Sequence, residues 1–145
     1  MRIVSGCLAG IHCRYDGDSK GDPRIVAMVA AGEALPICPE QAGGLPTPRT
    51  RSYLASHETF RLVDDNGVDV TVQYSRGAAE ALRLAKLIGA TEAILKEGSP
   101  SCGSCRVSVL DGEGHKSEVS GAGITTTVLR SEGITVFSEE NWQGK

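Results

Sequence analysis

The segment Arg2-Ile-Val-Ser-Gly-Cys7 decides the fold, because it has the pattern of a short buried strand that ends in a turn at a cysteine. Its centre consists of β-branched apolar residues, and a glycine follows close behind. The arrangement recurs twice along the chain: Ala34–Ile37 is followed by Cys38, and Ala93–Lys96 leads through a glycine-rich turn to Cys102. We therefore expect three core strands, each with a cysteine beyond its carboxyl end.

The segments around these strands predict helices. Arg24–Ala31 has the composition of a short apolar helix, with a proline at its first turn and a glycine after its end. A longer helix capped by Ser75 is expected to run to Ile88, because apolar residues there form two adjacent rows. A third helix is expected at Ile124–Ser131. Strands joined by helices predict an α/β fold, a compact three-layer domain around a mostly parallel sheet.

Other segments are expected to form loops and small strands. Phe60–Val63 and Val68–Val72 flank an Asn-Gly turn and predict a small β-hairpin insertion. Residues 39–48 contain three prolines and two adjacent glycines, so we expect an irregular loop there. Two further strands are expected, one weak strand at Val107–Leu110 that a polar loop follows to Ser120, and a last strand at Ile134–Phe137.

Composition limits the class of protein. A chain of 145 residues with 40% hydrophobic residues fits one domain, residues 1–145, with its own core. The net charge of −3 and an aromatic content of only 4% disfavour a nucleic acid as partner. The chain enters a strand pattern at once and has no run of about 18 apolar residues, so a cytoplasmic protein without a membrane segment is expected.

The five cysteines predict chemistry rather than disulfides, because an odd number in a reducing compartment does not form a disulfide framework. Open α/β sheets bind ligands outside the carboxyl ends of their strands, so Cys7, Cys38 and Cys102 are expected to meet there. Three soft ligands indicate a metal or iron–sulfur centre with one coordination position free. Nothing but proximity implicates Cys13 and Cys105, for which burial as small apolar side chains is an equal alternative.

A zinc site is the main alternative. Cys102 and Cys105 form a C-x-x-C pair that, with two other cysteines, would complete the tetrahedron of a non-catalytic zinc-binding module. A thioredoxin-type redox pair is disfavoured, because the residues after Cys105 have a strand pattern where that motif requires a helix N-terminus. A phosphatase loop is disfavoured as well, since six residues separate Cys7 from Arg14 where five are required.

Three longer motifs go beyond the spacing of cysteines. They are Ser5-Gly-Cys-Leu-Ala-Gly-Ile-His-Cys-Arg-Tyr-Asp-Gly17, Cys38-Pro-Glu-Gln-Ala-Gly-Gly-Leu-Pro-Thr-Pro-Arg49 and Lys96-Glu-Gly-Ser-Pro-Ser-Cys-Gly103. Together they closely resemble the thiouracil desulfidase family, and the resemblance covers essentially the whole chain. It is the short, single-domain members of that family that this sequence resembles.

The resemblance implies a cofactor and a reaction. The cofactor is a 4Fe–4S cluster held by Cys7, Cys38 and Cys102, whose fourth iron has no protein ligand. The reaction is the non-redox desulfuration of 2-thiouracil or a related thiolated pyrimidine, a small-molecule base, to uracil and hydrogen sulfide. The open iron would act as a Lewis acid.

The resemblance also implies roles for residues beside that iron. Glu40 is expected to activate water or to protonate the ring nitrogen, as a carboxylate in that place can do. The Ser99 hydroxyl is expected to hold the substrate or to relay a proton. Arg14, Tyr15 and Asp16 are expected to hydrogen-bond the substrate or to shape the first loop, with turn formation as the alternative for Asp16. Arg49 and Arg51 are expected to contact a uracil carbonyl or the phosphate of a larger nucleotide, with an ordinary surface position as the alternative.

Overall fold

The computed structural model describes residues 1–56 and 58–144 and contains two four-stranded sheets. Sheet A has the order β2-β1-β5-β8, with every neighbouring pair parallel. It consists of β1 (Arg2–Ser5), β2 (Ala34–Ile37), β5 (Glu92–Leu95) and β8 (Thr135–Ser138). The three core strands and the last strand expected from the sequence are therefore present, within one or two residues of their expected ends.

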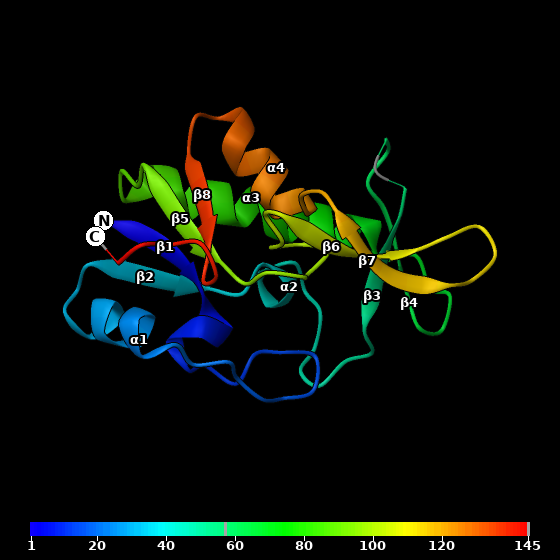
Figure 1. Cartoon of the computed structure of the whole chain (residues 1–145), viewed down its shortest axis with the longest axis horizontal. Helices are drawn as coiled ribbons and strands as arrows, with labels where there is room; N and C mark the ends of the chain where they lie inside the picture. Colours follow the sequence, from blue (N-terminus) through cyan, green and yellow to red (C-terminus); the bar gives the residue numbers. More distant parts are fainter. Residues whose placement is uncertain (57, 145) are drawn as a thin grey trace.

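Helices cover both faces of sheet A, as Figure 1 shows, with α1 (Pro23–Ala30) on one side and α3 (Thr71–Leu87) with α4 (Ile124–Ser131) on the other. Neighbouring strand residues point to opposite faces. Ile3 accordingly packs in the cluster with residues of α3 and α4, and Val4 packs in the cluster with residues of α1. The three-layer α/β architecture predicted from the sequence is confirmed.

Helix α3 begins earlier than the sequence indicated. We expected Ser75 to cap it, but the helix starts at Thr71. The Asp69 carboxylate accepts the Thr71 N–H at 2.9 Å, and the Thr71 hydroxyl oxygen accepts the Leu62 N–H at 2.9 Å. The start is thus set partly by a contact with a neighbouring strand, which a search for a local cap does not find.

Sheet B is the part of the fold that the sequence predicted least well. It has the order β4-β3-β6-β7. Its pairs are antiparallel except β3 with β6, which are parallel. The strands are β3 (Ser52–Ser56), β4 (Arg61–Asp64), β6 (Arg106–Leu110) and β7 (Lys116–Ser120). Of the small hairpin insertion that we expected, only the first strand is present, as β4 of this second sheet.

Two expectations in sheet B are wrong. The expected hairpin partner Val68–Val72 forms only an isolated bridge, Val63 with Asp69, before the chain enters α3, and β4 pairs instead with β3. The expected polar loop up to Ser120 contains β7. All five residues of β7 are exposed, so the strand lacks the alternation of buried and exposed residues by which strands are recognised.

A short helix, α2 (Pro39–Ala42), stands where we expected only irregular loop. It starts directly after Cys38, with Pro39 at its first position, where the fixed φ of proline fits a helix. It packs closely on α3: a Cβ atom added to Gly77 would lie 1.9 Å from the carbonyl oxygen of Pro39. Glycine is required at this crossing, which fixes α2 at the end of β2.

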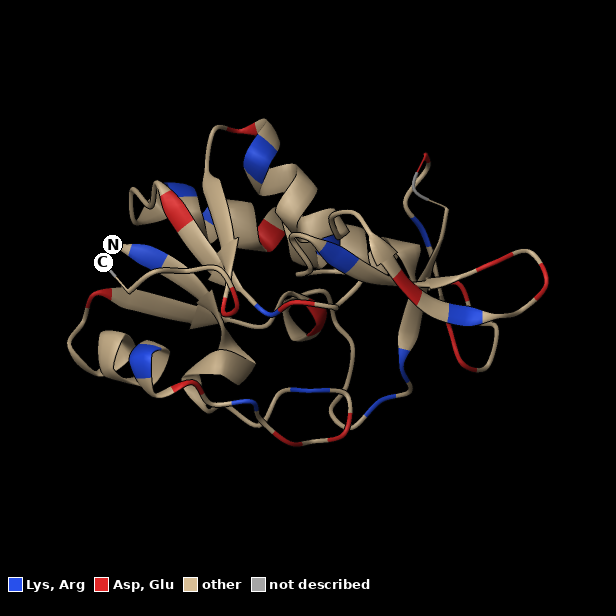
Figure 2. Ribbon diagram, viewed as in Figure 1, with Lys and Arg blue, Asp and Glu red and all other residues tan. Residues whose placement is uncertain are grey.

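The charged residues are interspersed along the chain. In Figure 2, basic and acidic segments alternate around the loop that precedes α1 and on β6 and β7. Within the described ranges, none of the helices has both the length and the apolar character needed to cross a bilayer.

Candidate functional site

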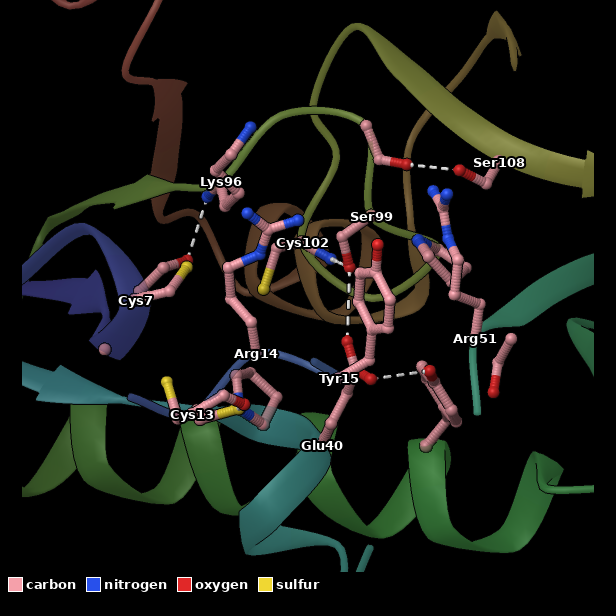
Figure 3. Close-up of a pocket in the computed structure, with 18 of the residues that line it drawn as sticks. Cys7, Cys13, Arg14, Tyr15, Glu40, Arg51, Lys96, Ser99, Cys102 and Ser108 are labelled. Atoms are coloured by element: carbon pink, nitrogen blue, oxygen red, sulfur yellow. Dashed lines mark hydrogen bonds between the residues drawn. The ribbon is translucent and has the colours of Figure 1, made fainter. Parts of the chain in front are cut away.

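A cavity of about 220 Å³ lies at the carboxyl ends of β1, β2 and β5, where sheet A faces sheet B. The loops after these three strands form one wall, and sheet B contributes Ser52, Ser108 and Glu118 to the other. Figure 3 shows the thiols of Cys7, Cys13 and Cys102 on one side of this space, with Arg51 and Ser108 on the opposite side.

Four of the five cysteines line the cavity, and all five are free thiols. Cys7 lies in the 3₁₀ turn η1 (Gly6–Ala9) directly after β1, and Cys38 is the first residue after β2. Cys102 lies in the loop after β5. Because β2, β1 and β5 are neighbours in sheet A, their carboxyl ends bring these three thiols to one place.

Cys13 is the fourth thiol of the cavity and is only 1% exposed. Its hydrogen bonds to Cys7 and Cys38 lower the pKa of Cys7 and lower the pKa of Cys38 to about 7, against the effect of burial. The same hydrogen bonds raise the pKa of Cys13 itself. Burial raises the pKa of Cys102. Two of the three strand-end thiols are thus favoured as thiolates, the form that ligates metals.

The donor set fits an iron–sulfur cluster better than a single zinc ion. In the part of the chain that the structure describes, no group of three or more His, Cys, Asp or Glu side chains is arranged to hold one metal ion. The C-x-x-C pair is also divided: Cys102 lines the cavity, whereas Cys105 is exposed and accepts a hydrogen bond from the Asn141 amide at 3.6 Å. The thiols instead surround a space large enough for a group of several atoms.

Glu40 reaches the cavity from α2 and is held by three neighbours. One carboxylate oxygen accepts hydrogen bonds from Arg49 Nε at 3.1 Å and from the Tyr74 hydroxyl at 2.8 Å. The other oxygen accepts a hydrogen bond from Ser99 Oγ at 3.4 Å, drawn in Figure 3. The two residues that the family resemblance singled out, Glu40 and Ser99, therefore touch each other although 59 positions separate them.

Ser99 also organises the loop that carries Cys102. Its hydroxyl oxygen accepts the backbone N–H groups of Ser101 at 3.0 Å and Cys102 at 3.1 Å. With both N–H groups donating to it, the Ser99 hydroxyl has its own proton free to donate toward Glu40. One side chain thus joins the acid of the site to the thiol loop.

Arg49 connects several parts of the site through hydrogen bonds. Its guanidinium donates to Glu40, to the Thr47 hydroxyl at 2.9 Å, and to the carbonyl oxygens of Cys13 at 2.9 Å and Pro46 at 3.1 Å. We expected Arg49 to contact the substrate. It does line the cavity, but the contacts observed orient Glu40 and the segment around Cys13.

Arg14 and Tyr15 lie at the cavity, together with Arg51. Both guanidiniums stack on the Tyr15 ring, at 5.5 Å for Arg14 and 5.0 Å for Arg51. Among the described residues, neither guanidinium forms an ion pair with a carboxylate, so both remain able to bind a polar group of a substrate. Asp16 is exposed and lies outside the lining. Its carboxylate accepts the Asp18 N–H at 3.0 Å, which is the turn-forming alternative.

Three residues of the site escaped the sequence analysis. Cys13 was present in the first motif, but its spacing from Cys7 matches no common metal-binding pattern. Tyr74 is 2% exposed and lies on α3, but the helix was expected to begin only after Ser75, so Tyr74 fell outside it. Glu97 is 4% exposed, and only its position directly after a core strand marked it.

The fold and site define a class of protein: an α/β enzyme with a cluster of free thiols and a half-buried acid at the carboxyl ends of its parallel strands. Residues 3–141 match the 2-thiouracil desulfurase family, and the chain belongs to this family. The family, the α/β fold class and the desulfidase activity predicted from the sequence are thereby confirmed.

Two similar proteins agree with this assignment. One is a solved structure described as a [4Fe-4S]-dependent thiouracil desulfidase, TudS, which is 47% identical with a TM-score of 0.85 and matches over 95% of this chain and 89% of its own. The other is the uncharacterized protein YbbK of Bacillus subtilis (strain 168), 38% identical over 146 residues, which cover 96% of this chain and 95% of that protein.

Proposed function

We propose that this chain removes sulfur from 2-thiouracil or a related thiolated pyrimidine with a 4Fe–4S cluster held by Cys7, Cys38 and Cys102. The observation that carries the proposal is that these thiols line the same cavity as the hydrogen-bonded pair Glu40 and Ser99. The similarity to a [4Fe-4S]-dependent enzyme at 47% identity supports the choice of cluster. When bound, the cluster supplies an iron without a protein ligand as a Lewis acid for the substrate sulfur.

The chemistry asked of the protein is a hydrolysis: one water supplies the oxygen of uracil, and its two protons leave with the sulfur as hydrogen sulfide. Glu40 accepts a proton from the attacking water. The Ser99 hydroxyl, which donates to Glu40, passes a proton between that carboxylate and the ring nitrogen. Arg49 and Tyr74 hold the carboxylate in place throughout, so that it need not be reoriented for each transfer.

The pyrimidine binds in the cavity beside the thiols. Arg14 lies on the thiol side of Tyr15 and Arg51 on its other side (Figure 3), so either guanidinium can meet a carbonyl oxygen or a more polar substituent of the substrate. Asp16 shapes the turn beside these residues and makes no direct contact in this proposal. Residues 1–145 act as one domain in the cytoplasm, where reducing conditions keep the thiols free.

Anaerobic reconstitution tests the proposal. The chain is loaded with iron and sulfide and assayed for sulfide release from 2-thiouracil, from a thiolated nucleoside and from its monophosphate. We expect about four irons per chain and release of uracil with hydrogen sulfide. A colourless protein with one zinc and no sulfide release would refute the function.

A pair of carboxylate variants tests the role of Glu40. Glu40→Ala is expected to keep its iron and lose sulfide release by roughly 100-fold or more. Glu33→Ala removes an exposed carboxylate just before β2 and serves as the matched control. Equal turnover in Glu40→Ala and the control would show that Glu40 takes no part in the reaction.

A further inference from the structure

The buried carboxylate of Glu97 has no part in the chemistry above, yet it makes more hydrogen bonds than other acids near the site. Its Oε1 atom accepts the backbone N–H groups of Ser104 at 2.9 Å and of Cys105 and Arg106 at 3.0 Å each. A weaker contact comes from the N–H of Gly98 at 3.4 Å, and the Ser104 hydroxyl donates to Oε2 at 3.3 Å. One side chain therefore fastens both ends of the segment 98–106.

The segment that Glu97 closes is the loop that holds half of the site. Inside it, the Ser99 carbonyl accepts the Gly103 N–H at 2.8 Å, and the Ser99 hydroxyl accepts the Cys102 N–H. A Cβ atom added to Gly103 would lie 2.2 Å from the carbonyl oxygen of Arg106 and 2.8 Å from that of Ser99, so the loop is tightly folded around this glycine, and its ends meet in the isolated bridge between Gly98 and Val107. Hydrogen bonds from both ends of the loop to the Glu97 carboxylate thus close the loop, and we call this closing point its neck.

The charge of Glu97 is stabilised by dipoles. Burial opposes the charged form, but the three N–H donors at 104–106 outweigh it and lower the pKa of Glu97 to about 2. A carboxylate held in this way stays ionised at working pH and is costly to remove from its donors. The Glu97 N–H in turn donates to the Glu139 carboxylate at 2.9 Å, which ties the neck of the loop to the segment after β8.

The loop needs this support because of how the three strand-end thiols are attached. Cys7 and Cys38 lie two residues and one residue beyond their strands, so sheet A fixes them directly. Cys102 lies seven residues beyond the end of β5 at Leu95 and is held through its loop, by Glu97 at the ends of the loop and by α4, where the Thr126 hydroxyl donates to the Cys102 carbonyl oxygen at 2.9 Å. Its position depends on what holds the loop.

We propose that Glu97 is a positioning residue of the desulfidase, which sets Cys102 and Ser99 relative to the thiols and the acid carried by sheet A and α2. The inference rests on the proposed function. A displacement of about 1 Å at Cys102 or Ser99 is enough to disturb both the cluster and the proton path, because catalysis depends steeply on such distances.

Two variants of Glu97 and one control test the proposal in the iron-loaded enzyme. Glu97→Gln keeps a carbonyl oxygen for the N–H donors and removes the charge, whereas Glu97→Ala removes the anchor. Glu140→Gln is the control. It removes an exposed carboxylate whose two oxygens accept hydrogen bonds from the Arg106 guanidinium at 2.7 and 2.6 Å. Each protein is measured for kcat and KM with 2-thiouracil, iron per chain, the electron paramagnetic resonance spectrum of the reduced cluster, and amide hydrogen exchange.

The expected result is graded. Glu97→Ala lowers kcat by roughly 100-fold and changes the cluster spectrum. Glu97→Gln restores most of kcat but exchanges the amides of 104–106 about tenfold faster than wild type, because a neutral acceptor forms weaker hydrogen bonds. Glu140→Gln resembles wild type in all four measurements.

The outcomes separate this inference from the function on which it rests. Wild-type protein that binds iron but releases no sulfide would refute the function, and an altered cluster spectrum in Glu97→Ala would still support the positioning role. Active wild type, together with a Glu97→Ala variant of unchanged kcat and spectrum, would overturn the role of Glu97. If Glu97→Ala does not fold, Glu97→Gln decides: unchanged exchange at 104–106 overturns the proposal.

Discussion

Sheet A and sheet B enclose the same cavity but are built in different ways. Sheet A is parallel, lies between helices on both faces, and has buried residues such as Ile3, Val4 and Ile94 with no exposed surface. Sheet B is mixed, and its outer strand β7 is exposed along its whole length. The thiols come from the ends of the first sheet, whereas Ser52, Ser108 and Glu118 come from the second.

The comparison teaches that the two halves of the site have different requirements. A cluster needs several ligands at fixed mutual distances, and adjacent parallel strands in a packed core supply them. A substrate must enter and leave, and a sheet whose outer strand β7 is exposed along its whole length permits this. The predictions below test the division, from the largest expected effect to the smallest.

Loss of a thiol from sheet A is expected to abolish activity. Cys38→Ser removes one of the three proposed cluster ligands, at the residue directly after β2, so we expect iron content to fall and sulfide release to drop to background. Iron analysis and sulfide assay of the anaerobic protein measure this. Cys105→Ser, which changes an exposed thiol outside the cavity, is the matched control and is expected to keep full iron. Equal iron in both variants would contradict the ligand assignment.

The two sheets are expected to differ in how much they contribute to stability. Ile94→Ala creates a cavity between sheet A and helix α1 and is expected to lower the free energy of unfolding by about 2–5 kcal/mol. Val119→Ala on β7 changes an exposed side chain and is expected to change it by less than about 0.5 kcal/mol. Urea titrations of both variants provide the comparison, and similar losses would mean that sheet B is as much a part of the core as sheet A.

Glu97 joins the end of β5 to the start of β6, so its charge is expected to couple the two sheets in a pH-dependent way. Its pKa is about 2 in the folded protein, below that of an unfolded glutamate, so its stabilisation is fully present above about pH 5 and disappears as the pH falls towards 2. Wild type is expected to exceed Glu97→Gln by about 3 kcal/mol at pH 7 and to match it near pH 2. Urea titrations across this range measure the difference, and a constant gap would exclude the carboxylate charge as its cause.

Tyr74 supports the acid of the site from α3, and its loss is expected to have the smallest effect. Tyr74→Phe keeps the packing and removes one hydrogen bond to Glu40, which predicts a fall in kcat of about tenfold with unchanged iron. Steady-state kinetics with 2-thiouracil measure it. Tyr53→Phe, which alters another tyrosine hydroxyl on sheet B, is the control. An unchanged kcat in Tyr74→Phe would show that the Tyr74 side chain contributes only packing.

The sequence predicted the parts of this protein in which neighbouring residues carry the signal. Each core strand of sheet A is a short apolar run, and α1 is marked by Pro23 at its start and Gly32 after its end. The motifs around Cys7, Cys38 and Cys102 pointed to one site because each cysteine lies in the loop that directly follows a core strand.

The tertiary structure decided what depends on residues far apart in the chain. Strand β3 pairs with β4 and, through Leu54 and Val109, with β6. No local sequence pattern predicts either pairing. In the same way, the Tyr74 hydroxyl and the Ser99 hydroxyl meet at Glu40 from segments 34 and 59 positions away.

What the sequence determined by itself was therefore the kind of chemistry: free thiols at strand ends, an acid and a hydroxyl in recognisable motifs. What only the tertiary structure decided was how that chemistry is held, by Cys13 between two thiols, by Tyr74 and Arg49 on Glu40, and by Glu97 at the neck of the Cys102 loop. The physical reason is that a hydrogen bond acts over about 3 Å in space, whatever the separation along the chain.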